Sequence, residues 1–296
     1  MQAPHTRNTI YIEDARILSH DSLEGEQYIL RLHAPEIAGS AHPGCFVHLT
    51  CHESLPMRRP MSIMRAQGGS GWIEILYKAH GQGTRLLSQR RPGEFINLIG
   101  PIGNPFKLSG YRKQPLLIGG GVGIPPMLYL AEHIKNLAKE CTPLVVMGSE
   151  LPFPFQARPS QIMLPGLPEG TIACMPLLED WGIPSRLSSL QGFAGCYQGY
   201  VTDLGRHWLD NLNADRRDDV ELFGCGPMPM LEAVARLADD FSLPCQLSLE
   251  EYMACAVGGC WGCAVPVQTA NGVAMKRVCV DGPVFEAHSV FPKGDV

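Results

Sequence analysis

Residues 255–263 read CAVGGCWGC, and a further cysteine stands at position 279, so the full spacing is C-x4-C-x2-C-x15-C. This is the cysteine spacing of plant-type ferredoxins, whose thiolates bind a [2Fe–2S] cluster. Glycines within the loop allow backbone N–H groups to approach the sulfur atoms closely. We therefore predict that a [2Fe–2S] cluster is bound by Cys255, Cys260, Cys263 and Cys279.

The residues between Cys263 and Cys279 indicate how the last cysteine returns to the loop. An apolar run, AVPVQT, is followed by the turn pair Asn271-Gly272 and then by MKRV. Two strand-like runs joined by Asn-Gly are typical of a β-hairpin. This hairpin would bring Cys279 beside the first three cysteines.

Structural zinc and disulfide bonds are the other uses of such cysteines. Structural zinc sites usually have two short-spaced pairs of ligands, whereas here three ligands lie in one loop and the fourth lies alone. A disulfide framework fits poorly with 11 cysteines, an odd number, and the first residues, MQAPHTRNTI, lack the pattern of a secretion signal. We favour the cluster, keep zinc as the alternative, and expect a reducing, cytoplasmic environment.

The composition of the chain argues against nucleic-acid and membrane partners. A net charge of −5 argues against a nucleic-acid partner, because such a partner calls for a basic surface. No run reaches the ~18 apolar residues of a membrane span, so we expect no membrane partner. The 32 glycines and 25 prolines indicate a chain rich in turns, and a length of 296 residues predicts two or three domains.

The pattern of short runs predicts an antiparallel β-barrel over residues 1–110. The strand-like runs, separated by turns, are NTIYIEDARIL, EQYILRLHA, CFVHLTC, WIEILYKA and EFINLIGP. YILRLHA alternates apolar and polar residues, as half-buried strands do. We expect one helix within the barrel, beginning near Thr84.

Strands then alternate with helices, which predicts a parallel α/β domain over residues 111–244. The strand-like runs are QPLLIGGG, PLVVMGSE and VELFGC, and helices are expected over Pro126–Glu140, VTDLGRHWLD and PMPMLEAVARLADDF. The proline-rich segment 151–184 is expected to be mostly loop, with one strand near TIACMP. A small cysteine module would occupy residues 245–296, which makes the fold multidomain α+β.

Two motifs of the barrel suit a phosphorylated cofactor. Arg59-Pro60-Met61-Ser62 is placed between barrel strands, and an arginine offers a planar set of donors that matches a pyrophosphate. Gly81-Gln82-Gly83-Thr84 precedes the expected helix, with Thr84 as its N-cap, and a helix N-terminus presents free N–H groups to phosphate.

Two glycine motifs of the α/β domain follow buried strands and open helices. They are Gly119–Gly123, continuing into Ile124-Pro125-Pro126, and Gly224-Cys225-Gly226-Pro227. Ligands of open α/β folds bind at the carboxyl ends of the strands, although the spacing G-x-G-x-x-P departs from the G-x-G-x-x-G fingerprint. Glu150, at the end of PLVVMGSE, favours NAD over NADP because a carboxylate repels a 2′-phosphate.

Together these motifs resemble one family, the electron-transfer subunits of dihydroorotate dehydrogenases, a branch of the ferredoxin–NADP reductase superfamily. RRPMSI and LYKAHGQGT resemble its FAD-binding segments, GGGVGIPPM and FGCGPMPML its pyridine-nucleotide loops, and SLEEYMACAVGGCWGC with CVDGPVF its cluster-binding tail. The resemblance covers nearly the whole chain.

The resemblance implies an FAD-binding barrel over residues 1–110, an NAD-binding domain over 111–244 and a [2Fe–2S] domain over 245–296. It implies that FAD is bound by Arg59, Pro60, Met61, Ser62, Leu76, Tyr77, Lys78, Gly83 and Thr84. It also implies that Gly121 and Gly123 line the nicotinamide side of the flavin, together with Cys225 as a catalytic residue.

The activity implied by the resemblance is that of an oxidoreductase subunit in pyrimidine biosynthesis. A partner subunit with FMN would oxidise dihydroorotate to orotate, and this chain would pass the electrons through the cluster and FAD to NAD⁺, in a heterotetramer with two copies of each subunit. Two alternatives stay open. In the first, the same module serves another partner, such as a hydrogenase or a ferredoxin-dependent transhydrogenase. In the second, the chain is a redox-inactive regulatory subunit that binds zinc.

Overall fold

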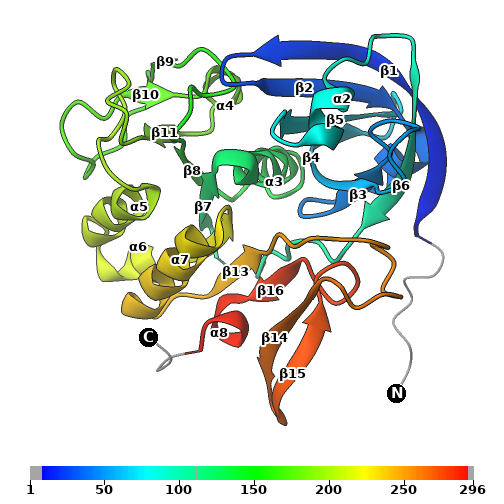
Figure 1. Cartoon of the computed structure of the whole chain (residues 1–296). Helices are drawn as coiled ribbons and strands as arrows, with labels where there is room; N and C mark the ends of the chain where they lie inside the picture. The colour runs from blue at the N-terminus through cyan, green and yellow to red at the C-terminus, as the bar shows by residue number, and fades with distance from the viewer. Residues whose placement is uncertain (1–8, 111, 293–296) are drawn as a thin grey trace.

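The computed structural model describes residues 9–110 and 112–292, which form a barrel, an α/β sheet and a C-terminal module (Figure 1). The predicted fold class is confirmed, since an antiparallel barrel precedes a largely parallel sheet flanked by helices. The predicted domain limits at residues 1, 111 and 296 lie outside the described residues, and the division at residues 244/245 stays a prediction.

Six antiparallel strands close the barrel in the order β1-β2-β5-β4-β3-β6. The strands are β1 (Tyr11–Leu23), β2 (Gln27–His33), β3 (Phe46–Leu49), β4 (Arg59–Gln67), β5 (Trp72–Lys78) and β6 (Phe95–Ile102). Both faces of β5 are covered, because Ile75 packs in the barrel interior while Leu76 packs against the α/β domain. The sequence suggested that Arg59 and Ser62 lie between strands. They lie within β4, because their backbone pairs with that of β3.

Two short helices accompany the barrel, α1 (Pro35–Ser40) and α2 (Gln82–Leu87). The sequence analysis missed α1. It also placed the start of α2 too late, since Gly81 is the N-cap and Thr84 is already in the first turn.

The sheet of the α/β domain has the strand order β11-β8-β7-β12-β13-β16. Its strands are β7 (Gln114–Gly120), β8 (Leu144–Gly148), β11 (Ser185–Ser188), β12 (Val220–Cys225), β13 (Cys245–Ser248) and β16 (Val284–Glu286). All neighbours are parallel except β13 and β16, which are antiparallel.

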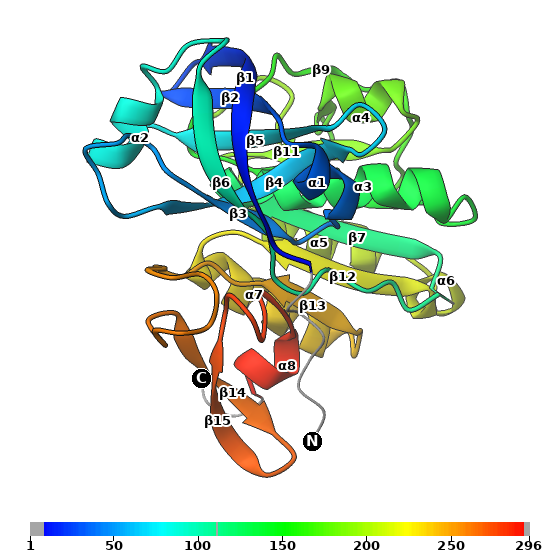
Figure 2. The ribbon, with the colours of Figure 1, turned by 90° about the vertical axis from the view of Figure 1, so that its right-hand side faces the viewer.

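Helices cover both faces of this sheet. They are the 3₁₀ turn η2 (Gly121–Gly123), α3 (Ile124–Leu137), α4 (Pro176–Asp180), α5 (Val201–Asp210), α6 (Ala214–Asp218), α7 (Met228–Asp240) and α8 (Ala287–Val290). Alternate residues of β7 point to opposite faces, so Leu116 and Ile118 share a core with α5 and α7, while Leu117 shares a core with α3. Helix α3 lies between the sheet and the barrel, beside β4 (Figure 2).

The C-terminal module is an excursion between two neighbouring strands of the sheet. The chain leaves at β13, forms the cysteine loop and the hairpin β14 (Ala264–Thr269) and β15 (Gly272–Arg277), and returns as β16. The predicted hairpin is confirmed, and the strands on either side of the module, β13 and β16, belong to the α/β sheet.

The proline-rich segment is mostly loop, with the short strands β9 (Arg158–Pro159) and β10 (Ala173–Cys174), the latter within the run TIACMP.

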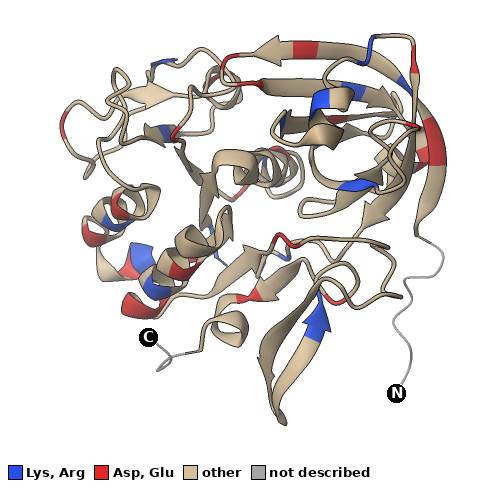
Figure 3. Cartoon of the chain, in the orientation of Figure 1, with Lys and Arg blue, Asp and Glu red and all other residues tan. Residues whose placement is uncertain are grey.

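Charged side chains of both signs are interspersed on α5, α6 and α7 (Figure 3). Across the described ranges, every helix falls short of the length and apolarity needed to cross a membrane.

Candidate functional site: three cofactor-binding regions

The hairpin brings the fourth cysteine to the loop. Strand pairing runs from Ala264↔Arg277 to Thr269↔Gly272, and the Val278 N–H donates to the Cys263 carbonyl at 3.0 Å. Cys279, the next residue, is therefore held beside Cys263, and both are buried. The predicted arrangement, with three cysteines in one loop and the last delivered by the hairpin, is present in the structure.

The four thiols are arranged as two pairs. The Cys260 N–H donates to Cys255 Sγ at 3.4 Å, and the Cys263 and Cys279 thiols are close enough to affect each other's ionisation. In the part of the chain that the structure describes, no three Cys, His, Asp or Glu side chains gather at a point where one metal ion would be held. Two pairs of thiolates suit a cluster in which each of two irons takes two cysteine ligands.

Backbone N–H groups of the loop point at the sulfur atoms. Gly259 and Cys260 donate to Cys255 Sγ at 3.3 and 3.4 Å, and Gly262 donates to Cys260 Sγ at 3.4 Å. Burial opposes ionisation of Cys255, but hydrogen bonds from backbone N–H groups and from the Cys260 thiol outweigh it and lower the pKa of Cys255 to about 7. The thiolate is the metal-binding form, so the loop suits iron ligation.

Gly258 shows why the loop needs a glycine. Its φ is +81°, and a Cβ atom there would lie 3.0 Å from Val280 Cγ2. The Gly258 carbonyl also accepts from Arg277 Nη1 at 2.9 Å, and the Arg277 guanidinium lies 4.6 Å from the Trp261 ring centroid. These contacts fix the loop against the hairpin.

In the barrel, β4 and the N-terminus of α2 meet at Arg59. A Cβ atom on Gly83 would lie 3.3 Å from Arg59 Nε, so the absence of a side chain at Gly83 leaves room for the guanidinium. The Thr84 hydroxyl accepts from the N–H groups of His80 and Gly81 at 3.0 and 3.1 Å. The structure thus brings together three of the predicted FAD residues, and a guanidinium beside a helix N-terminus fits the pyrophosphate of FAD.

The other predicted FAD residues divide between the two faces of their strands. Met61 packs against the barrel core, and Tyr77 lies inside it, with its ring stacked on Tyr28 at 5.4 Å. Residues before and after them in a strand point the opposite way, which places Pro60, Ser62, Leu76 and Lys78 on the outer face. Leu76 borders a cavity of about 280 Å³ between the barrel and the α/β domain.

The two glycine loops of the α/β domain are in direct contact. They follow neighbouring parallel strands, with Cys225 paired to Gly119. A Cβ atom on Gly123 would lie 2.1 Å from the Cys225 carbonyl oxygen, so only glycine permits this approach. Gly121, by contrast, is exposed, with φ of +54° and open space around its Cβ position.

Cys225 is fully buried at the carboxyl end of β12. Burial raises the pKa of its thiol well above the usual value, an effect that Glu250 reinforces and a hydrogen bond with Ser248 partly offsets. A neutral thiol is therefore the form present at neutral pH. The catalytic role of Cys225 stays a prediction.

Sequence reasoning missed Glu250, which follows β13 at the same edge of the sheet. Glu250 is exposed to solvent, although neighbouring protein partly desolvates its carboxyl and raises the pKa of that group. Its charge in turn acts on the Cys225 thiol. The signal was available in SLEE, where acids directly follow a buried strand.

Known proteins resemble this chain over most of its length. Residues 250–291 match the model of the iron–sulfur cluster binding domain of dihydroorotate dehydrogenase B. The electron transfer subunit of dihydroorotate dehydrogenase B (NAD(+)) from Caldanaerobacter subterraneus subsp. tengcongensis is 33% identical over 279 residues, covering 93% of this chain and 97% of that protein. Its counterpart from Desulforamulus reducens is 29% identical, covering 94% and 97%.

A solved structure of an NADH-dependent reduced ferredoxin–NADP oxidoreductase, reported in connection with flavin-based electron bifurcation, superposes with a TM-score of 0.75 at 25% identity, covering 94% of this chain and 90% of the other. The ferredoxin reductase of carbazole 1,9a-dioxygenase shares the fold with a TM-score of 0.60 at 19% identity, covering 79% and 67%. The chain belongs to the family of electron transfer subunits of dihydroorotate dehydrogenase B.

Proposed function

We propose that this chain is the oxidoreductase subunit that carries electrons between a dihydroorotate-oxidising partner and NAD(H) in pyrimidine biosynthesis. The observation that carries the proposal is that the hairpin places Cys279 beside the three cysteines of the loop, in a module anchored to the sheet that bears both glycine loops. The similarity to dihydroorotate dehydrogenase B subunits over nearly the full length of both chains supports the same reading.

Each region has a proposed task. Cys255, Cys260, Cys263 and Cys279 bind the [2Fe–2S] cluster, and the N-terminal barrel binds FAD through Arg59, Gly83 and Thr84 and the outer face of β4 and β5. Gly121, Gly123 and Cys225 form the nicotinamide side. FAD, when bound, exchanges a hydride with nicotinamide and single electrons with the cluster. The protein's own contribution is to align these groups.

The partner is proposed to dock over the cysteine loop. Residues 252–263 contain no Lys, Arg, Asp or Glu. Tyr252, Val257 and Trp261 are 93%, 51% and 54% exposed, so the cluster region presents apolar side chains to solvent. Exposed aromatic residues of this kind are typical of interface centres. The catalytic subunit with FMN is the proposed occupant, in a heterotetramer with two copies of each chain.

The electron acceptor is proposed to be NAD⁺, and the location the cytoplasm. Glu150 is exposed two residues after β8, where its carboxylate would accept a hydrogen bond from a ribose 2′-hydroxyl and repel a 2′-phosphate. Eleven cysteines, an odd number, of which four have the spacing of cluster ligands, fit a reducing compartment better than a disulfide framework.

The test begins with the visible spectrum and iron content of anaerobically purified protein. Flavin absorption with iron–sulfur features, and two irons per chain, are the expected results, whereas a colourless zinc protein would refute the cluster. Reconstitution with the FMN-containing subunit should then give dihydroorotate-dependent reduction of NAD⁺. A coloured protein that reduces NAD⁺ only with a hydrogenase or a ferredoxin would instead assign the module to another partner.

A further inference from the structure

A charged contact crosses the boundary between the barrel and the α/β domain. Arg65, on β4, donates from Nη2 to Glu132 Oε1 at 2.7 Å and from Nε to both carboxylate oxygens at 3.2 Å. Glu132 lies on α3. The two side chains are only 19% and 11% exposed, so this interdomain ion pair is largely shielded from water.

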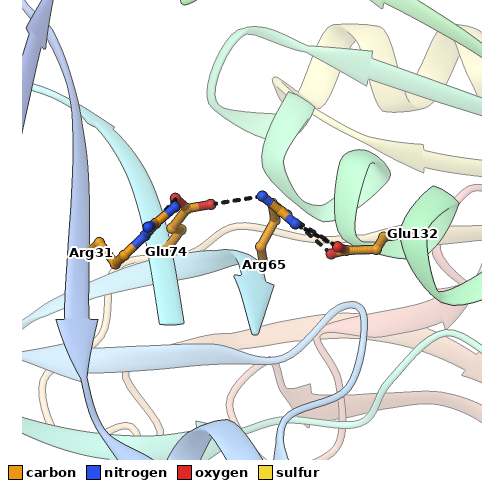
Figure 4. Close-up of polar contacts among 4 residues, drawn as sticks. All are labelled: Arg31, Arg65, Glu74 and Glu132. Atoms are coloured by element: carbon orange, nitrogen blue, oxygen red, sulfur yellow. Dashed lines mark hydrogen bonds and ion pairs between the residues drawn. The ribbon is translucent and has the colours of Figure 1, made fainter. Parts of the chain in front are cut away.

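The surroundings fix the orientation of Arg65 (Figure 4). Its Nη1 lies 3.6 Å from Glu74 Oε2, and Arg31 donates to the other oxygen of Glu74. The guanidinium also lies 5.4 Å from the Trp72 ring centroid and 5.3 Å from that of Trp181. Two arginines thus balance two carboxylates, and neither carboxylate is left as an unpaired buried charge, which would be costly.

The interdomain ion pair joins the two elements on which the cofactor regions depend. Ser62, on the proposed FAD strand, precedes Arg65 by three residues, or ~10 Å along β4. Glu132 lies two turns beyond the start of α3, which places the ion pair ~12 Å along the helix from Ile124, the residue that follows the nucleotide loop. Arg65 also lines the cavity that Leu76 borders. Strand and helix are both stiff, so the contact acts close to both sites.

A small tilt at this contact has a large effect at the site. Rotating α3 by ~10° about Glu132 would move its first residue by ~2 Å, using the ~1.5 Å rise per helical residue. A displacement of ~1 Å between reacting groups lowers a rate by on the order of 100-fold. The orientation of α3 relative to β4 is therefore a property on which the reaction depends.

We propose that Arg65 is a positioning residue for hydride transfer, in that its ion pair with Glu132 sets the position of the nicotinamide loop relative to the flavin strand. This inference rests on the proposed function. The hydrogen bonds described for Arg65 run to Glu132, and not to the proposed FAD residues or the glycine loops. Its loss is therefore expected to alter alignment and leave cofactor content unchanged.

The test uses the FAD- and cluster-loaded protein with the substitution Arg65→Met. Stopped-flow reduction by NADH, in which NADH is oxidised to NAD⁺ as FAD takes up the hydride, should slow 10- to 100-fold. The affinity for NADH should stay within twofold, and the long-wavelength charge-transfer absorbance of the flavin–nicotinamide complex should weaken. Hydrogen exchange, measured also on flavin-free protein, should be faster in α3.

Arg31→Met is the matched control. Arg31 pairs with the same carboxylate, Glu74, and stacks on Trp72 at 4.5 Å, and both of these partners lie in β5 and not in α3. NADH should reduce the FAD of Arg31→Met at the native rate. A loss as large as that of Arg65→Met would overturn the proposal, because the effect would then come from Glu74 and not from the domain boundary.

Glu132→Leu provides a second variant in case Arg65→Met binds no FAD. It keeps Arg65 paired with Glu74 and removes only the contact across the boundary. Native flavin reduction and native charge-transfer absorbance in Glu132→Leu would overturn the proposal. A wild-type protein that NADH does not reduce would instead refute the proposed function, so the two failures are distinguishable.

Discussion

Replacing Gly123 by alanine tests whether the two glycine loops must touch. The added Cβ atom would lie 2.1 Å from the Cys225 carbonyl oxygen, 2.3 Å from its carbonyl carbon and 2.5 Å from the Gly226 nitrogen. All three are backbone atoms of β12 or its loop, so no side chain can rotate to make room. The loops must separate.

The magnitude follows from the shortfall in distance. Contacts of a Cβ atom are essentially never shorter than 3.0 Å, so the loops must separate by about 0.9 Å. Overpacking of this kind costs about 1–3 kcal/mol of unfolding free energy. Because the shift occurs on the proposed nicotinamide side of the flavin, a displacement of ~1 Å should slow hydride transfer on the order of 100-fold.

The assay combines two measurements on Gly123→Ala. Denaturant unfolding gives the loss of stability, and stopped-flow absorbance gives the rate of flavin reduction by NADH. Iron content and the cluster spectrum should be unchanged, since the cysteine loop does not contact Gly123. Gly69→Ala is the control, because nothing lies within 4 Å of its Cβ position and its φ is not positive.

The reasoning would be refuted by a Gly123→Ala protein with native stability and a native rate of flavin reduction. Native stability alone, with a slow rate, would mean that the loops yield easily but that their spacing still governs alignment. Equal losses in Gly69→Ala would show that any added methyl group has this effect.

Three further predictions concern single residues. Cys260→Ser should abolish electron transfer from the partner to FAD while NADH still reduces FAD, which rapid-mixing spectra of the complex can check; native relay would remove Cys260 from the ligand set. Arg59→Ala should weaken FAD binding about 10- to 100-fold through the loss of a charged hydrogen bond worth ~1.5–3 kcal/mol; unchanged flavin content after dialysis would contradict its role. Burial and the adjacent Arg58 lower the pKa of His48 to about 4, so the unfolded chain binds more protons than the folded one as the pH falls from about 6.5. As the pH is lowered, the unfolding free energy should therefore fall by up to ~1.4 kcal/mol per pH unit. In denaturant titrations between pH 7 and pH 4.5, His48→Phe should lack this contribution to the pH dependence of the unfolding free energy.

The sequence predicted well those features that depend on residues close together in the chain. The β14–β15 hairpin follows from a turn pair between two strand-like runs, and the cysteine loop from spacing alone. The α/β alternation was equally visible, since β7 and β12 are continuous apolar runs and each is followed by glycines and a helix.

Features that depend on distant residues were not predictable in this way. Arg65 and Glu132 are 67 positions apart, and nothing in either segment indicates the other. Helix α1 has only six residues, too few to show a period. The side chains of Tyr77 and Met61 pack in the barrel, and only the closed barrel reveals which face of each strand is inside; their place at the cofactor stays a prediction.

The return of the chain at β16 has a consequence for how the iron centre is maintained. Both ends of the excursion are hydrogen-bonded into adjacent strands, with Gln246 opposite Glu286 and Ser248 opposite Val284, and this pairing involves none of the four cluster cysteines. A cell could thus strip a damaged centre and rebuild it on a preformed support, and over evolutionary time the loop could be altered or exchanged without redesigning the enzyme beneath it.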